Sequence, residues 1–248
     1  MRTIMVGLAV FVAGSLGSGA SLSVGSAAQW YLVAMPNLNT FVGLTNSTIA
    51  FVNGLIPEGE PVPPLATLRD GIGLRFTEAL GETWQVGVQM ALASVGTATQ
   101  GVWTRGEVTH PVNISLEAGL GAFEAEVTLA LVPDVVTIGL SAGWGTARVV
   151  YRGAFPNTLP TDWSLPFVPR VEAKTYTTHG PVGSAYARVS LPFGPGMAVG
   201  FEAGFRLAPL GVPQAGASVL DLNRDGVGDP VDFSGLWLGL TVRIAFNL

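Results

Sequence analysis

The sequence predicts an all-β fold, namely an eight-stranded antiparallel transmembrane β-barrel with long extracellular loops and short periplasmic turns. Three observations lead to this prediction. Only 12% of the 248 residues are charged, against roughly 25% in ordinary globular chains. From residue 21 onward, apolar side chains alternate with small or polar ones in segments of about ten residues, the pattern of a membrane barrel strand. The connections between these segments are alternately short and long, as outer-membrane barrels require.

The composition excludes several other classes of protein. Apolar residues make up 48% of the chain, which also has 33 glycines and a mean hydropathy of +0.47. Beyond the first residues, however, no apolar run reaches the roughly 20 residues of a membrane-spanning helix. The absence of cysteine excludes disulfides and thiolate-held metals. A net charge of −5 without a cluster of basic residues argues against a nucleic-acid partner.

The first 20 residues have the features of an export signal. Arg2 is followed by an apolar run, Ile4–Ala13, that is too short to span a bilayer. A stretch of glycine, serine and alanine then leads to a cleavage point before Ser21. We therefore expect residues 1–20 to be a signal peptide and residues 21–248 to be the barrel. The alternative is an N-terminal strand or plug segment.

The last segment of the chain shows the alternation most clearly. From Leu236 to Leu248, a large aliphatic residue or phenylalanine occupies every second position, and the residues between them are small or polar apart from Trp237. A strand with this pattern has one apolar face and one polar face. We expect eight such strands, at residues 22–32, 72–76, 84–92, 119–131, 136–144, 183–193, 197–207 and 236–248.

The connections predict which end of each strand faces the periplasm. The short links are rich in turn residues and lie at residues 78–82, 133–134 and 192–196. The long links lie at about residues 33–69, 93–118, 145–182 and 208–231. Outward-facing aromatic residues are expected at both rims of the apolar band, because a bilayer interface favours them; the alternative is a soluble barrel with these aromatics in its core. The rim near the short turns would comprise Phe76, Trp84, Phe193 and Phe246, and the other rim Trp30, Trp144 and Phe205.

These features resemble the small eight-stranded outer-membrane barrels, the class that includes outer-membrane proteins A, X and W and the major barrel of Thermus. The resemblance covers about residues 21–248. It includes the terminal strand ending Ile244–Leu248, which looks like the C-terminal assembly signal of that class, although this chain ends in leucine where an aromatic residue is common. The resemblance implies a location in the bacterial outer membrane, with outer-membrane lipids as the surrounding partners.

Eight strands enclose an interior that side chains can fill, so the fold alone does not predict a porin. The alternation places four positive and three negative side chains inside the barrel. They are Arg75, Glu124, Glu126, Arg188, Glu202, Arg206 and Arg243. We expect Arg188, Glu202 and Arg243 to form one cluster, because buried ions are tolerated only when they are paired. The near balance of charge favours a closed plug, and a gated or narrow pore lined by these charges is the alternative.

The last long connection contains a candidate calcium site. From Asp221 to Asp232, oxygen-bearing side chains occupy loop positions 1, 3, 5, 9 and 12, with glycine at position 6, as in the calcium loop of EF-hands. The segment resembles the dockerin and thrombospondin-repeat variants of that loop, although no helix pattern flanks it. The expected ligands are Asp221, Asn223, Asp225, the Val227 carbonyl, Asp229 and Asp232. The alternative is a solvated acidic loop without a metal.

The sequence does not predict an enzyme. The two histidines, His110 and His179, are expected in long loops, and neither has a neighbouring serine or carboxylate in the spacing of the barrel deacylases or barrel proteases. An envelope hydrolase would require a carboxylate that approaches one of them in space.

The first long connection is unusually apolar for an extracellular loop. Residues 41–56 contain eight large apolar side chains, and a proline-rich stretch at 57–64 follows, which we expect to be stiff and extended. These residues are expected to pack as a small external domain or to mark a docking face for a cell-surface partner. The predicted function is therefore a structural, envelope-stabilising or surface-interaction role with a Ca²⁺-stabilised extracellular region. The alternative is a narrow channel or carrier for small or hydrophobic solutes.

Overall fold

The computed structural model describes residues 21–33, 35–56, 60–81, 83–154, 174–221 and 225–247. The predicted signal peptide at residues 1–20 lies outside these ranges. Among the helices in the described ranges, none has the length and apolar character needed to cross a membrane.

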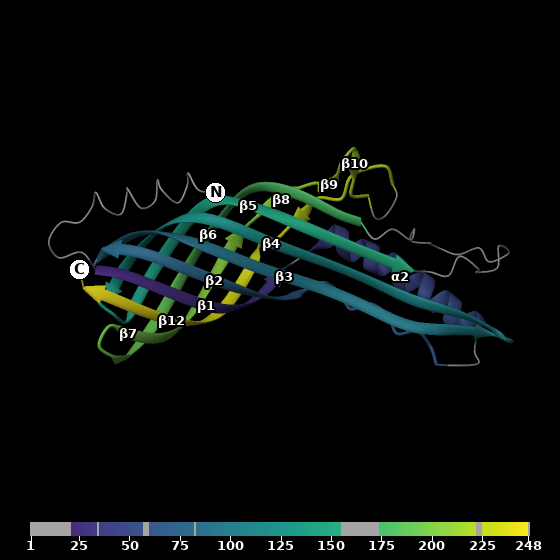
Figure 1. Ribbon diagram of the computed structural model, residues 1–248, viewed down its shortest axis with the longest axis horizontal. Coiled ribbons are helices and arrows are strands. Elements are labelled where there is room, and N and C mark those ends of the chain that lie inside the picture. Colours follow the sequence, from purple (N-terminus) through teal and green to yellow (C-terminus); the bar gives the residue numbers. More distant parts are fainter. Residues whose placement is uncertain are drawn as a thin grey trace.

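Eight long antiparallel strands form a closed ring (Figure 1), which confirms the predicted fold class. Each strand pairs with the next along the chain, and β12 pairs with both β7 and β1 to close the ring. Closure leaves no free edge where the wall crosses the membrane, because every strand there has two neighbours. The strands are β1 (Ser21–Val33), β2 (Asp70–Gly81), β3 (Trp84–Arg105), β4 (Val108–Val132), β5 (Val136–Ala154), β6 (Lys174–Gly194), β7 (Met197–Leu207) and β12 (Gly235–Asn247).

The outer face of the ring is an apolar belt. On β12, Leu238 is 60% exposed while the adjacent Trp237 is 1% exposed, and the same alternation runs through all eight strands. A belt of exposed apolar side chains on a closed barrel is the lipid-facing surface of a transmembrane barrel. Trp84, Phe193 and Phe246 lie at its periplasmic rim, and Trp30, Trp144 and Phe205 lie at the opposite rim.

One rim residue was predicted wrongly. Phe76 pairs with Ser26 on β1 and Met90 on β3, so it lies in the middle of the belt and not near the short turn. The reason is that β2 continues to Gly81, five residues beyond Phe76. Alternation alone gives the face of a side chain but not its depth in the membrane.

The second long connection is a strand extension and not a loop. The predicted loop at residues 93–118 consists mostly of the outer halves of β3 and β4, which pair without interruption as far as Arg105 and Val108. β5 and β6 likewise continue beyond the belt, to Ala154 and from Lys174. Four strands on one side of the barrel thus rise out of the membrane as a sheet, which extends to the right in Figure 1.

The two faces of this sheet exchange their chemical character at the belt boundary. Within the belt, β3 directs Gln89 inward and Leu92 outward, whereas beyond it the same faces carry buried Trp103 and exposed Gln100. On β4 the buried face changes from Glu124 to apolar residues such as Leu116. The period of two therefore continues, but the face that avoids water changes sides. This reversal explains why the outer halves lacked the pattern expected of a membrane strand.

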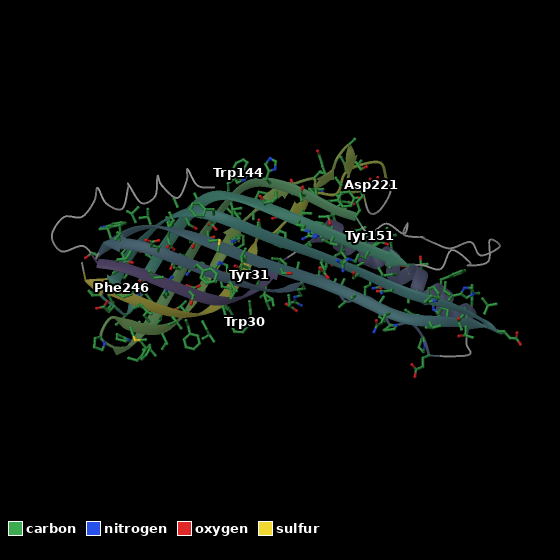
Figure 2. All side chains as sticks on the ribbon, viewed as in Figure 1. Trp30, Tyr31, Trp144, Tyr151, Asp221 and Phe246 are labelled. Carbon is green, nitrogen blue, oxygen red and sulfur yellow. The ribbon has the colours of Figure 1, made fainter. Side chains whose placement is uncertain are left out.

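Helix α2 (Pro36–Leu55) covers the apolar face of the extended sheet. Its buried residues recur at intervals of three or four, which places them on one helical stripe. Phe41 on this stripe packs edge-on against Tyr151 of β5, with ring centroids 5.1 Å apart, and Tyr151 is labelled beside α2 in Figure 2. The first long connection thus packs as an external layer, as the sequence predicts.

Three asparagines of α2 bind the segment that follows the helix, residues 60–69, which we call the strap. The side chain of Asn46 accepts a hydrogen bond from Leu65 N at 2.7 Å and donates one to Leu65 O at 2.9 Å. Asn39 makes the same pair of bonds with Leu68, and Asn53 with Val62. The strap also contacts β3, since Thr99 Oγ1 donates to Pro63 O at 2.6 Å. These bonds satisfy backbone groups of a segment that belongs to no sheet.

The last long connection packs along the β6 edge of the extended sheet, on the face that α2 also covers. It contains the short strands β8 (Pro209–Gly211), β9 (Gln214–Ala215), β10 (Ser218–Val219) and β11 (Val231–Asp232). β9 pairs with β6, and Thr178 Oγ1 of β6 donates to Leu210 O at 2.6 Å. Leu210, Leu220 and Phe233 are buried in the same core as α2. One hydrophobic core thus unites the first and last connections above the barrel.

The lipid-facing belt can be tested with a charge at its centre. Leu240 lies opposite Phe201 on β7 and Ala28 on β1, deep in the belt. Leu240→Arg should lower the free energy of unfolding from lipid vesicles by about 2 to 4 kcal/mol. The matched control is Gln100→Arg, on the outer face of β3 beyond the belt, which should change stability little. Equal stability of the two variants in vesicles would show that the belt has been assigned wrongly.

Candidate functional site

A cluster of buried charges fills the barrel at the level of the belt, with Glu202 of β7 at its centre. The Glu202 side chain is completely buried and forms ion pairs with Arg75 of β2 and Arg188 of β6. Arg188 donates to it from Nε at 3.2 Å, and Gln29 of β1 donates to it from Nε2 at 3.1 Å. Donors from three different strands thus converge on one carboxylate, which is the condition under which a buried charge is tolerated.

The network continues through Arg75 to a second carboxylate. Arg75 Nη1 lies 3.6 Å from Glu126 of β4 and donates to Gln89 Oε1 at 3.2 Å. The Tyr186 hydroxyl also donates to Glu126, and the Arg75 guanidinium lies 4.3 Å from the centre of the Tyr186 ring. A cation over an aromatic face is held by the ring quadrupole as well as by its anionic partners. Arg75 therefore joins two carboxylates from non-adjacent strands, β4 and β7.

A third carboxylate, Glu124, extends the network toward the extracellular side. Its Oε2 accepts hydrogen bonds from Ser141 Oγ at 2.6 Å and from Ser184 Oγ at 3.2 Å. Arg206 lies 3.9 Å from its other oxygen and donates to the Tyr31 hydroxyl at 2.9 Å. The pair of Glu124 and Arg206 is thus linked to the other four charged residues through the uncharged side chains Tyr31 and Gln29.

Glycines in the wall make room for the aromatic members of the cluster. A Cβ atom at Gly139 would lie 2.3 Å from the Tyr186 ring, and one at Gly73 would lie 2.5 Å from the Tyr31 ring. Both tyrosines therefore lie flat against a neighbouring strand, a close approach that only glycine permits. In this orientation their hydroxyls reach the charged residues.

The structure brings together six of the seven predicted interior charges, namely Arg75, Glu124, Glu126, Arg188, Glu202 and Arg206. The predicted contact between Glu202 and Arg243 is wrong. Glu202 pairs with Gly239 in the register of β7 and β12, so Arg243 lies four residues closer to the periplasm, about 13 Å along the strand. Arg243 instead lies 3.5 Å from Asp134 in the β4–β5 turn.

The aromatic part of the cluster was not predicted from the sequence. Tyr31, Tyr186 and Trp237 are each 5% exposed or less and face the interior. A signal for them was present, because Tyr31 lies two residues from Gln29, and Tyr186 two residues from Arg188, on the same face of their strands. Large aromatic side chains on the face that carries the charges indicate that the interior is filled.

Side chains close the barrel at two levels. At the level of the belt, the cavity beside the cluster has a volume of about 10 Å³, roughly the space of one water molecule. Above the cluster, Leu120, Val182 and Trp237 belong to the hydrophobic core that includes α2. Figure 2 shows Tyr31 within the barrel, whereas Trp30, the preceding residue, lies on the outer face. At the periplasmic end a recess of about 550 Å³, lined in part by Arg243 and Asp134, opens below the cluster.

The predicted calcium ligands are placed as follows. Asp221 Oδ2 accepts from Gly226 N at 3.1 Å, Asp225 Oδ1 from Val227 N at 2.7 Å, and Asp232 Oδ1 from Ser234 N at 2.8 Å. Gly226 has φ +84°, the conformation that the sharp turn of a calcium loop needs. In the described ranges no three acidic or histidine side chains gather as metal ligands. Of the remaining expected ligands, Asp229 is buried, Val227 is exposed, and Asn223 lies outside the described residues.

Both histidines lie on strands and not in loops, which corrects the prediction. His110 is buried on the inner face of β4, and His179 is exposed on β6 with its ring 6.2 Å from that of Trp144. The extension of β4 and β6 beyond the belt accounts for the difference.

The architecture is that of a small outer-membrane β-barrel. No protein-family model and no curated protein sequence matches the chain. Solved structures of outer-membrane barrels are similar to it at low identity, so the fold assignment rests on the ring of strands itself.

Three of these similar structures come from different bacteria. Ail, the attachment invasion locus protein of Yersinia pestis, in complex with the heparin analogue sucrose octasulfate, is 11% identical with a TM-score of 0.41, over 93% of this chain and 100% of Ail. The outer membrane protein OprG of Pseudomonas aeruginosa is 9% identical with a TM-score of 0.42, over 93% of this chain and 97% of OprG. The translocator domain of the autotransporter NalP of Neisseria meningitidis is 10% identical with a TM-score of 0.29, over 100% and 96% of the two chains.

The charged cluster should be sensitive to the loss of its central carboxylate. Glu202→Gln would leave Arg75 and Arg188 buried without their shared anion, and we expect a loss of about 3 to 5 kcal/mol in the free energy of unfolding. Urea unfolding in detergent micelles or vesicles measures this loss. Glu117→Gln, on the exposed outer face of β4, is the control and should be nearly neutral. A sharp rise in conductance with little loss of stability would instead identify the cluster as a gate.

Proposed function

We propose that this chain is a closed barrel of the bacterial outer membrane with a structural, envelope-stabilising or surface-interaction role. The observation that carries the proposal is the double closure of the interior by the charged cluster and, above it, by the hydrophobic core. A wide aqueous pore needs an open, hydrated interior, whereas here the wall-to-wall contacts run between side chains. We propose no catalytic role.

The ordered layer outside the membrane supports this proposal. Four strands, helix α2, the strap and the last connection share one core, so the layer is built as a folded unit on the barrel. Its outer face is polar beyond the belt, as an aqueous surface requires. A rigid layer held at a fixed height above the bilayer suits a protein that contacts other envelope or cell-surface molecules. Because the interior of the barrel is filled, such a layer serves contact with other molecules better than it serves transport.

The three asparagines of α2 allow the layer to be loosened without change to the barrel. In the triple variant Asn39→Ala, Asn46→Ala, Asn53→Ala, six hydrogen bonds to the strap are lost, each worth about 0.5 to 1.5 kcal/mol. We expect protease to cut the strap while the barrel stays inserted. We expect cells that produce the wild-type protein to gain detergent resistance or surface adherence, and cells that produce the variant to lack this gain. Asn113→Ala, on the outer face of β4, is the control.

Conductance separates the structural role from the channel alternative. A structural barrel should show no steady conductance in planar bilayers and no effect on solute uptake, whereas a channel should show both. Sustained single-channel currents from the wild-type protein, unaltered in the asparagine variant, would move the function to transport.

We further propose that Ca²⁺ orders the loop from Asp221 to Asp232. Two observations support the fit: the positive φ of Gly226, and a buried Oδ1 of Asp221 that has no hydrogen-bond donor in the described part of the chain. An oxygen of this kind is satisfied by a hard cation. Bound Ca²⁺ would also neutralise carboxylates that otherwise repel one another.

Calcium binding should appear as a chelator-sensitive stability. Metal that binds only the folded form raises stability by about 2.7 kcal/mol at a hundredfold excess over its dissociation constant. Chelator should therefore lower the melting temperature of the wild type but not that of Asp221→Ala, Asp225→Ala. Titration calorimetry with Ca²⁺ provides the direct measurement. No heat of binding at millimolar Ca²⁺, or equal chelator sensitivity in both proteins, would leave only an acidic surface loop.

A further inference from the structure

The small cavity beside the charged cluster is lined by three arginines. Arg75, Arg188 and Arg243 reach it from β2, β6 and β12, and the hydroxyl-bearing residues Thr77 and Thr241 complete its polar wall. Its volume of about 10 Å³ admits one water molecule or one small ion. No acidic side chain lines it.

The charges around this cavity do not balance. The inward-facing residues of the described strands include four arginines and three glutamates, which leaves one positive charge in excess. Glu202 Oε2 is shared between Arg75 and Arg188. Among the described residues the ion-pair partner of Arg243 is Asp134, whose side chain is 78% exposed and lies at 3.5 Å. An ion pair with such an exposed partner contributes little, so Arg243 is the arginine whose charge is poorly compensated.

One of the arginines that line the cavity has a donor without an acceptor. Arg75 is 1% exposed, and its Nε is buried without a hydrogen-bond partner among the described atoms. The hydroxyls of Thr77 and Thr241 lie close over glycines of neighbouring strands: a Cβ atom at Gly25 would come within 2.8 Å of Thr77 Oγ1, and one at Gly200 within 3.1 Å of Thr241 Oγ1. Guanidinium and hydroxyl donors that line a small space are suited to an anion.

Arg243 lies between the cavity and the periplasmic side. This residue lines both the small cavity and the recess of about 550 Å³ at the periplasmic mouth. An ion that enters the recess therefore meets Arg243 first and the arginines of the cluster next. Beyond them Glu202 and the buried tyrosines block the way, so the path ends at the cluster.

We propose that this cavity binds one monovalent anion of the size of chloride, taken up from the periplasm. A single anionic charge offsets the excess arginine, whereas the second charge of a sulfate or hydrogen phosphate would exceed it. A water molecule in the same place would accept hydrogen bonds but would leave the charge uncompensated. The site is independent of the surface role proposed above.

Halide dependence of unfolding tests the proposal on the full-length protein in detergent or vesicles. Sodium chloride and sodium gluconate are compared at equal ionic strength, because gluconate is too large for the cavity. We expect the melting temperature to be several degrees higher in chloride than in gluconate. This difference should reach a plateau as the chloride concentration rises, as binding to one site requires. Non-specific screening would act equally in the two salts.

Two variants at the site and one control give the test its specificity. Arg243→Gln and the charge-neutral Thr241→Val should lose most of the chloride increment. Arg206→Gln, at the other end of the cluster, should be less stable but should keep the increment, because Arg206 does not line the cavity. Equal melting temperatures of the wild type in the two salts, or the same increment in wild type and both site variants, would overturn the proposal.

Diffraction provides a second measurement that does not depend on variant stability. Crystals of the wild-type protein grown with bromide should show one anomalous peak between Arg75, Arg188 and Arg243. If crystals grown at high bromide concentration show no such peak, the site is contradicted, even if the variants fail to fold.

Discussion

The hydrogen-bonding requirement of the backbone in a bilayer is the constraint on which the rest of this structure depends. Hydrocarbon offers no partner to an N–H or C=O group, so a strand in it must be paired on both sides. The pairing of β1 with β12 meets this condition by closing the ring. A closed ring of eight strands in turn fixes a narrow interior. The small lumen then decides the character of the inner residues, because any charge placed there is removed from water and must find its counter-charge across the barrel.

The reversal of polarity along β3 and β4 divides the same strands into two environments. In the belt the surroundings are apolar and the lumen is polar, so the large apolar residues face outward. Above the belt the surroundings are water, and the apolar residues face inward to pack against α2 and the last connection. The two regions are continuous in hydrogen bonding, since β3 and β4 pair from one end to the other. The external layer therefore needs no separate linker and takes its orientation directly from the barrel wall.

Much of the barrel could be predicted from the sequence, because a period of two in the belt is a property of each strand by itself. The eight strands, the inward side of Arg75 and Glu124, and the rims at Trp84 and Trp144 all follow from it. Register between strands does not, since it depends on hydrogen bonds that leave no mark on either strand alone. For this reason Arg188 was predicted correctly as a partner of Glu202, whereas the second partner was predicted to be Arg243 and is Arg75.

The features above the belt were harder to predict for a different reason. The outer halves of β3 to β6 keep the alternation but carry small and polar residues outside, so they lacked the apolar band used to recognise strands. His110 was consequently expected in a loop. The helix at Pro36–Leu55 was expected only as an apolar segment, because its glycines, threonines and asparagines are weak helix formers. Its stability depends on packing against Tyr151 and its neighbours, which are remote in sequence.

The bonds between α2 and the strap have a consequence for how this segment can vary in length. Successive asparagines are seven residues apart on the helix, about 10.5 Å along its axis, while their partners Val62, Leu65 and Leu68 are three residues apart, about 9.3 Å in an extended chain. The two spacings match closely enough for all three pairs to form together. A single inserted or deleted residue on either side would put every later pair out of step. Homologous chains that keep this arrangement should therefore differ in length by whole repeats, three residues in the strap for every seven in the helix.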